Sequence, residues 1–177
     1  MEPNNRKKTV VRSFRLDEDA LGVLEDEASR EHASVNTLEN KLLWQYSEFT
    51  RFAKRFNSLQ ISHATFLLLL NSVPESELVK AASIAGRSAP AAYISSKYGQ
   101  MTGENIKRFM RDLSIHANWF QYDLNSADGY RKIILTHEFG SNWSLFLLHY
   151  FLEAFSLTGT KVTSDISETT VIFQMYP

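Results

Sequence analysis

The first third of the chain changes from an alternating pattern of hydrophobic and polar residues to a helical one. Residues 9–16 are rich in β-branched and aromatic residues, and near their end Phe14 and Leu16 alternate with Ser13 and Arg15. A period of two places successive side chains on opposite faces of a strand. The pattern therefore predicts a strand over residues 9–16 with one apolar and one polar face.

Two helices are expected after this strand. Asp17 is a suitable N-cap for the first helix, which begins with acidic residues and is expected to end near His32. Ser34 is a suitable N-cap for the second. The second helix is predicted to be long, because one apolar face continues through Val35, Leu38, Leu42, Gln45 or Tyr46, Phe49, Phe52 and Phe56.

This strand–helix–helix unit, residues 9–56, is not expected to be stable alone. A lone strand leaves its backbone N–H and C=O groups unpaired, and so short a segment buries little apolar surface. A second copy of the chain would solve both problems, because two strands could pair antiparallel over four interlocked helices. The shared dimer core would then consist of Phe14, Leu16, Leu21, Leu24, Val35, Leu38 and Leu42.

The order of these elements resembles the ribbon-helix-helix family of DNA-binding dimers, of the Arc, MetJ and CopG type. The resemblance rests on RSFRLDE at residues 12–18 and on ASVN at residues 33–36, and it covers about a quarter of the chain. The family usually has Gly at the turn between its helices, where this chain has His32 followed by Ala33. His tolerates the required positive φ better than most non-glycine residues, so we expect the turn to form.

The resemblance implies that the chain binds double-stranded DNA. A two-stranded ribbon fits the major groove, where the outward-facing residues would contact the bases; by parity these are Val11, Ser13 and Arg15. In the family the start of the second helix holds a phosphate, and a flexible basic arm over residues 1–8 is expected to add phosphate contacts. The expected phosphate-contacting residues are Arg6, Lys7, Lys8, Arg12, Ser34, Val35 and Asn36.

The distribution of charge is consistent with this orientation, although the net charge of the chain is only −1. Residues 1–16 carry five basic residues against the single acid Glu2, whereas residues 17–31 carry seven acidic residues against the single base Arg30. The positive end would face the DNA and the negative first helix would face away from it.

The composition, 44% hydrophobic and 22% charged residues, is that of a soluble globular protein of one or two domains. The chain has no cysteine, which excludes disulfides and thiolate metal sites and is compatible with a reducing cytosol. No signal peptide is visible, and the apolar run at residues 66–70 is too short to cross a bilayer. We expect a cytoplasmic protein with no cofactor and no bound metal.

Residues 57–117 are expected to form a helical connector. Its predicted helices run from Ser62 to residue 70, from Pro74 to Gly86, from Pro90 to Gly99 and onwards from Thr102.

Residues 118–177 are expected to form an α+β domain with two hairpins around one helix. The hairpins are predicted at residues 119–136 and 161–175, and the helix from Ser141 or Asn142 to about Ser156. The fold class is therefore α+β, with the order of the strands left open. The helix has more large apolar residues than one stripe requires, so it is either buried on both sides or part of a subunit interface; they are Trp143, Phe146, Leu147, Tyr150, Phe151 and Phe155.

One candidate ligand site lies where the first hairpin meets this helix. His137, Glu138, Asn142 and Trp143 would surround the free N–H groups of a helix start, where a small anion could bind. His137 could equally cap a turn, because no partner ligand lies at a fixed metal spacing. His149 lies among aromatic residues and is more typical of a packed core than of a haem ligand.

The ending of the chain is also distantly similar to the vinyl-reductase-like and methanogen-output ligand-binding domains. Vinyl-reductase domains commonly carry cysteines, which this chain lacks, so their metal and redox chemistry is not expected here. A DNA-binding dimer followed by a separate domain is a common arrangement in regulators. The second domain would then sense a small-molecule effector or add subunits.

The sequence is thus typical of a sequence-specific transcription regulator, a homodimer or a tetramer. An enzyme is not expected, because the chain has no Gly-rich phosphate loop, no Gly-x-Ser-x-Gly and no His-Glu-x-x-His. The residues available for acid–base chemistry would be Asp112, His116, Asp123, Asp128, His137 and Glu138. An antitoxin that binds a toxin through its C-terminal part is the alternative, but such tails are usually short and disordered, whereas residues 57–177 can build a core.

Overall fold

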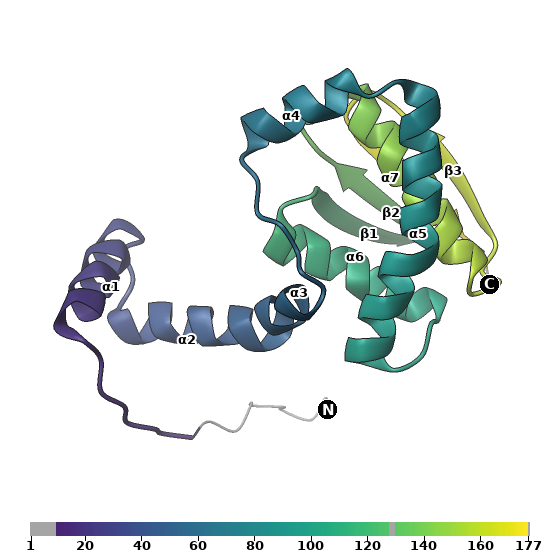
Figure 1. The fold of residues 1–177 in the computed structure, drawn as a ribbon. Helices are drawn as coiled ribbons and strands as arrows, with labels where there is room; N and C mark the ends of the chain where they lie inside the picture. Colours follow the sequence, from purple (N-terminus) through teal and green to yellow (C-terminus); the bar gives the residue numbers. More distant parts are fainter. Residues whose placement is uncertain (1–9, 128–129, 177) are drawn as a thin grey trace. The chain divides into compact units, whose positions relative to one another are not determined.

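The structure, a computed structural model, describes residues 10–127 and 130–176 and divides the chain into two units, Met1–Tyr46 and Ser47–Pro177. Its described part contains helices and one four-stranded antiparallel sheet (Figure 1), which confirms the predicted α+β class. The expected basic arm, residues 1–8, and Thr9 lie outside the described residues.

The first unit contains α1 (Glu18–Arg30) and α2 (Val35–Gln45), joined by a tight turn. The Ala33 N–H donates to the Ala28 carbonyl (2.9 Å), the His32 N–H donates to the Ser29 carbonyl (3.2 Å), and His32 has a φ of 52°. These bonds and the positive φ form a Schellman motif. The expected turn is therefore present, with His32 in the conformation that favours glycine.

The predicted strand at the start of this unit is not found. Residues 10–16 have no regular secondary structure, and every strand in the described part of the chain lies between residues 121 and 175. A strand requires a hydrogen-bonded neighbour, and the described segments of this single chain offer residues 10–16 none. The ribbon of the predicted ribbon-helix-helix arrangement is thus not found among residues 10–127 and 130–176 of the single chain.

The second predicted helix, residues 34–56, is interrupted by a wide turn. α2 is followed by the π-helical turn η1 (Tyr46–Thr50) and then by α3 (Arg51–Arg55). Helical residues therefore extend almost as far as predicted, but they include one π-helical turn. The boundary between the two compact units lies at Tyr46, within this segment.

The sheet of the second unit has the strand order β1-β2-β4-β3. Each hairpin contributes one central and one edge strand, and α7 connects the two hairpins, as the sequence predicted. The elements are β1 (Gln121–Ala127), β2 (Tyr130–Thr136), α7 (Ser141–Ser156), β3 (Val162–Ile166) and β4 (Thr170–Met175).

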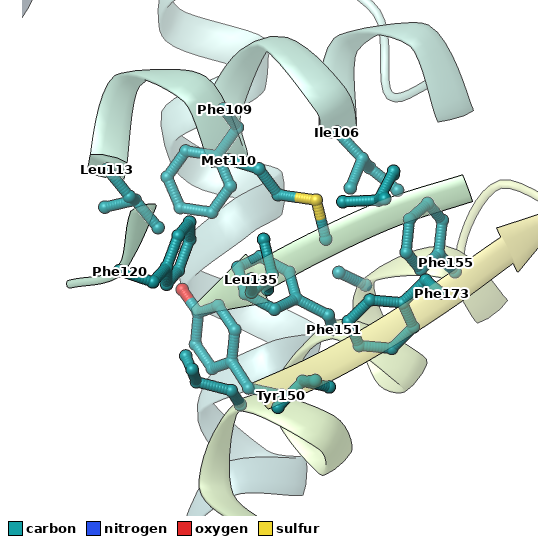
Figure 2. Packing of buried hydrophobic residues seen from close by; sticks show 14 of the residues in the cluster. Ile106, Phe109, Met110, Leu113, Phe120, Leu135, Tyr150, Phe151, Phe155 and Phe173 are labelled. Carbon is teal, nitrogen blue, oxygen red and sulfur yellow. The ribbon is translucent and has the colours of Figure 1, made fainter. Parts of the chain in front are cut away.

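One hydrophobic core lies between the sheet and the helices of this unit. Ile133 pairs with Phe173 and Leu135 with Val171 across the two central strands, and all four side chains are buried. Figure 2 shows Phe151 and Phe155 of α7 and Ile106 and Met110 of α6 directed toward this face of the sheet.

The helices expected to form a separate connector contribute to the same core. They are α4 (His63–Ser72), α5 (Glu75–Tyr98) and α6 (Gly103–Ala117). Their buried residues Leu70, Leu78, Ile94 and Phe109 belong to one cluster with those of the sheet. Residues 57–117 belong to the second unit and share its core.

The prediction of two helices between Pro74 and Gly99 is wrong, because α5 is continuous through Gly86 and Pro90. A proline removes one helical N–H bond and crowds the carbonyl four residues earlier, which here belongs to Gly86. Tertiary packing outweighs this local penalty, since both residues are buried against the rest of the unit. Gly99, with a φ of 86°, ends the helix as expected.

α7 lies between β3 and β4 on one side and α5 on the other (Figure 1). The sequence left open whether the many aromatic residues of this helix are buried on both sides or form a subunit interface. The structure supports burial on both sides. The helix begins after Gly140 (φ 76°), so the predicted caps Ser141 and Asn142 are its first residues instead. No helix within residues 10–127 and 130–176 is long and apolar enough to cross a membrane.

Candidate functional site

The residues expected to read DNA bases lie on the surface of the first unit. Val11, Ser13 and Arg15 are all exposed, and Val11 has 90% of its surface accessible. Arg12, expected to contact a phosphate, is exposed as well. Of the remaining basic residues, Arg6, Lys7 and Lys8 lie outside the described part of the chain.

The start of α2 has the geometry expected of an anion-binding helix N-terminus. The Ser34 hydroxyl oxygen accepts the Thr37 N–H (3.1 Å), which confirms Ser34 as the N-cap. The backbone N–H groups of Val35 and Asn36 precede the first possible intrahelical acceptor and lie at the positive end of the helix dipole. This first turn contains no acidic residue that would repel a phosphate.

The first unit buries very little of its own apolar surface. Among residues 10–46 the buried hydrophobic residues are Ala28 and Leu38, with 2% and 4% of their surfaces exposed. Most of the predicted dimer core is accessible in the single chain: Leu24 and Val35 are partly buried, whereas Phe14, Leu16, Leu21 and Leu42 are 59%, 41%, 36% and 45% exposed.

His137 is a buried, fully bonded residue at the end of β2. Its Nδ1 accepts the Phe139 N–H (3.3 Å), so in the neutral ring the proton is on Nε2, which donates to the Ser144 hydroxyl (2.9 Å). The Ser144 hydroxyl donates in turn to the Glu168 carbonyl (3.1 Å). Burial lowers the pKa of His137 to about 4, which keeps the ring neutral.

The other three residues of the candidate ligand site do not converge with His137 on one cavity. Asn142 donates its side-chain N–H to the Leu70 carbonyl, and the Trp143 indole N–H donates to the Trp119 carbonyl. A shallow depression of about 410 Å³ lies beside Glu138 and Asn142, but its second carboxylate, Glu168, makes the rim acidic. This charge disfavours the small anion for which the helix start was considered.

A buried polar cluster, which we call the Asp112 cluster, connects α5, α6 and η1. Asp112 of α6 accepts three hydrogen bonds at Oδ2, from the Lys97 ammonium (2.8 Å) and from the hydroxyls of Tyr93 (2.9 Å) and Tyr98 (2.7 Å). Lys97 also donates to the Glu48 backbone carbonyl (2.5 Å). The side chains of Lys97 and Asp112 are only 7% and 11% exposed.

Burial raises the pKa of both Tyr93 and Tyr98, and the neighbouring Asp112 carboxylate raises it further, so both hydroxyls remain donors. The sequence pointed to Asp112 only as one of several acidic residues. Tyr93 and Lys97 lie four residues apart on one face of the helix that was predicted from Pro90 to Gly99. That spacing does not indicate their contact with Asp112, which lies on another helix.

The remaining acid–base candidates are not assembled into a site. His116 follows Asp112 by one turn of α6, its ring stacks on Phe49 (5.2 Å between centroids), and burial lowers its pKa. Asp123 is exposed on an edge strand, and Asp128 lies outside the described residues. His149 is half-buried within α7. Nowhere in residues 10–127 and 130–176 do three His, Asp or Glu side chains lie close enough to hold a metal ion.

Neither the family models nor the curated proteins with which the chain was compared contain a match.

Proposed function

We propose that the protein is a homodimeric, sequence-specific DNA-binding transcription regulator. Residues 10–16 of two chains would pair as a ribbon that enters the major groove, and α1 and α2 of both chains would pack beneath it. The observation that carries this proposal is the small core of the first unit, in which Ala28 and Leu38 are the buried hydrophobic residues among residues 10–46. A helical pair with so little burial needs a partner to offset the entropy of ordering it.

The exposed apolar residues of this unit favour a second copy of the chain as that partner. Phe14, Leu16, Leu21 and Leu42 are the residues that parity and helical spacing place on the inner faces, and each is more than a third exposed. Phe14 and Leu16 belong to residues 10–16, whose backbone has no strand partner among the described residues, and Leu21 and Leu42 lie on α1 and α2. Dimerisation would bury the apolar faces and would also give this backbone hydrogen-bond partners.

The polar residues of the same unit favour DNA as the ligand. Arg12, Ser13 and Arg15 are exposed on the segment that would form the ribbon. The N–H groups of Val35 and Asn36 lie at a helix start without acidic residues, as a phosphate contact requires. Arg15 can donate two hydrogen bonds to guanine, so base reading is assigned to it first.

The second unit, residues 47–177, would sense an effector or add subunits. Its separate core favours a regulator over an antitoxin, because an antitoxin tail that wraps a toxin is usually short and disordered alone.

Selection of bound duplexes from random-sequence DNA, at two salt concentrations, tests this function. We expect recovery of a short palindromic or repeated site, with an affinity that falls as salt is raised and is lost when residues 1–16 are deleted. Absence of any DNA binding at low salt would refute the proposal, and the first unit would then serve as a dimerisation element alone.

A further inference from the structure

The π-helical turn η1 is held by side chains that reach its backbone. The Arg51 guanidinium donates through Nε to the Ser47 carbonyl (2.6 Å), and the Lys97 ammonium donates to the next carbonyl, that of Glu48. Arg51 belongs to the same helical segment, whereas Lys97 comes from the last turn of α5. Lys97 thus connects this turn to a distant helix through a charge-assisted hydrogen bond.

The position of the Lys97 ammonium is fixed from several directions. Its three N–H groups face three acceptors: the Glu48 carbonyl, Asp112 Oδ2, and the Glu48 carboxylate at 3.5 Å. Asp112 is itself held by Tyr93 and Tyr98, so it cannot follow a displaced ammonium. A buried charge of this kind is retained only when its partners are in place, because an unpaired buried charge is costly.

Apolar contacts already hold this segment against α5. Phe49 and Phe52 pack on the ring of Tyr93, with centroid distances of 6.2 and 5.8 Å. Attachment alone therefore does not require Lys97. A hydrogen bond to one particular carbonyl adds something that apolar packing does not, namely selection of the backbone geometry that presents that carbonyl.

A π-helical turn holds one residue more than the corresponding α-helical turn. Relative to an unbroken α-helix, it changes the rotation between the residues before and after it by about 100°. α2 immediately precedes this turn in the chain and α3 follows it. The Glu48 carbonyl that accepts from Lys97 lies within this turn, so the bond favours the backbone geometry that presents it.

We propose that Lys97 is a latch that holds η1 in its π-helical form, with Asp112, Tyr93 and Tyr98 holding the latch. Resting on the function proposed above, the inference adds that this latch makes DNA binding by the first unit depend on the α5–α6 pair of the second. Without the hydrogen bond from Lys97 to the Glu48 carbonyl, the turn samples several backbone conformations. Binding DNA then costs more conformational entropy, and affinity falls.

Lys97→Met removes the ammonium and keeps most of the apolar length, and Asp112→Asn removes the opposing charge while keeping an acceptor for the two tyrosines. Arg87→Met is the matched control, because it removes from the same helix the cation of an ion pair to Glu153, and the Arg87 side chain is 67% exposed whereas that of Lys97 is 7% exposed. Amide hydrogen exchange measured by mass spectrometry reports on residues 47–56 of the full chain. Affinity for the selected DNA site is measured on the same samples.

We expect exchange in residues 47–56 to become about tenfold faster in both latch variants, with the exchange of α7 unchanged. We expect DNA affinity to fall by about tenfold in both, because the disordered turn must be ordered on binding. Arg87→Met should change neither quantity by more than about twofold. If Lys97→Met does not fold, as judged by circular dichroism, the exchange and the DNA affinity of Asp112→Asn test the proposal instead.

Unchanged exchange in residues 47–56 would overturn the latch. Faster exchange with unchanged DNA affinity would overturn its regulatory role and leave the Asp112 cluster as a structural element. Failure of the wild-type protein to bind any DNA would instead refute the proposed function, and with it the regulatory role. The exchange measurement would still decide whether Lys97 holds the turn.

Discussion

Gly86 of α5 lies directly against the backbone of Tyr150 in α7. A Cβ atom at position 86 would be 2.3 Å from the Tyr150 carbonyl oxygen and 2.9 Å from its carbonyl carbon. Backbone atoms in the middle of a packed helix cannot move aside as the end of a flexible side chain can. The close approach of α5 and α7 therefore depends on the absence of a side chain at this position.

Gly86→Ala should destabilise the protein by about 2–3 kcal/mol, because the new methyl group forces the two helices apart. Gly22→Ala, in α1, is the matched control, since a Cβ at that position has nothing within 4 Å. It should stabilise its helix by about 0.5–1 kcal/mol through the lower entropy of the unfolded chain. Urea unfolding followed by circular dichroism measures both, and a neutral or stabilising Gly86→Ala would refute the close approach.

His137 should make the stability of the second unit depend on pH. Its pKa is about 4 in the folded protein against an ordinary value of 6.5, because burial disfavours the charged ring. Between these values the unfolded chain binds a proton that the folded chain does not, so stability is full above pH 6.5. It should fall by on the order of 3 kcal/mol as the pH is lowered to 4.

His137→Asn isolates this contribution, because an Asn side-chain oxygen can accept the Phe139 N–H in place of Nδ1 but cannot titrate. At pH 7 we expect the variant to be less stable than the wild type, since Ser144 loses its partner. Its stability should change less between pH 6.5 and 4. Equal slopes for the two proteins in urea unfolding over this range would show that His137 is not the responsible group.

Much of the fold could be predicted from local patterns. The turn at His32, the caps Ser34 and Ser62, and the hairpin–helix–hairpin order all depend on neighbouring residues, and the structure contains them. The break predicted at Gly86 and Pro90 is wrong, because the contact that keeps the helix continuous is made with residues distant in the sequence. The burial of α5 against α7 outweighs the helix-breaking tendency of both residues, and spacing along the chain contains no sign of that contact.

The candidate sites were predicted less well, for a related reason. His137 was identified as a residue of interest, but its bonds to Ser144 and Phe139 could not be inferred before the helix start was placed. The pairing of Lys97 with Asp112 joins two helices, so no pattern within either helix reveals it. The strand predicted over residues 9–16 is not found in the described residues 10–16, and the proposed ribbon would need a second chain as its hydrogen-bonded neighbour.

On the proposed dimer, Leu42→Glu should leave the protein monomeric and abolish the proposed sequence-specific DNA binding. Leu42 is 45% exposed in the single chain, so the substitution costs the monomer little, but in the dimer it would bury an unpaired carboxylate. Val23→Glu is the control, because Val23 is 68% exposed and lies outside the predicted core. Sedimentation equilibrium measures the mass of each, and a dimeric Leu42→Glu protein would exclude this face from the interface.

Arg15→Ala and Arg12→Ala should affect DNA binding in different ways. Arg15 faces outward by parity, and its loss should cost about 1–3 kcal/mol at the recovered site and relax the preference at one base pair. Arg12, expected on a phosphate, should weaken binding to all sequences about equally and reduce the slope of affinity against salt. Titration of both variants against the recovered site and its single-base changes measures this, and identical profiles would refute the assigned register.

The ribbon formed by two chains is the central element of the proposed function, and it can be tested by disulfide cross-linking. Because the chain has no cysteine, one cysteine introduced at each position from 10 to 16 gives seven proteins with a single thiol each. In an antiparallel pair related by two-fold symmetry, the distance between equivalent residues grows by about 7 Å for each step away from the axis. A disulfide requires Cβ atoms about 4 Å apart.

The decisive measurement is the rate of intermolecular disulfide formation in these seven proteins, with and without the recovered DNA site. We expect a sharp maximum at one position or at two adjacent positions, a steep fall on both sides, and an unchanged maximum when DNA is bound. Slow cross-linking at every position, or a uniform rate along residues 10–16, would show that these segments do not pair across a dimer, and the ribbon would be refuted.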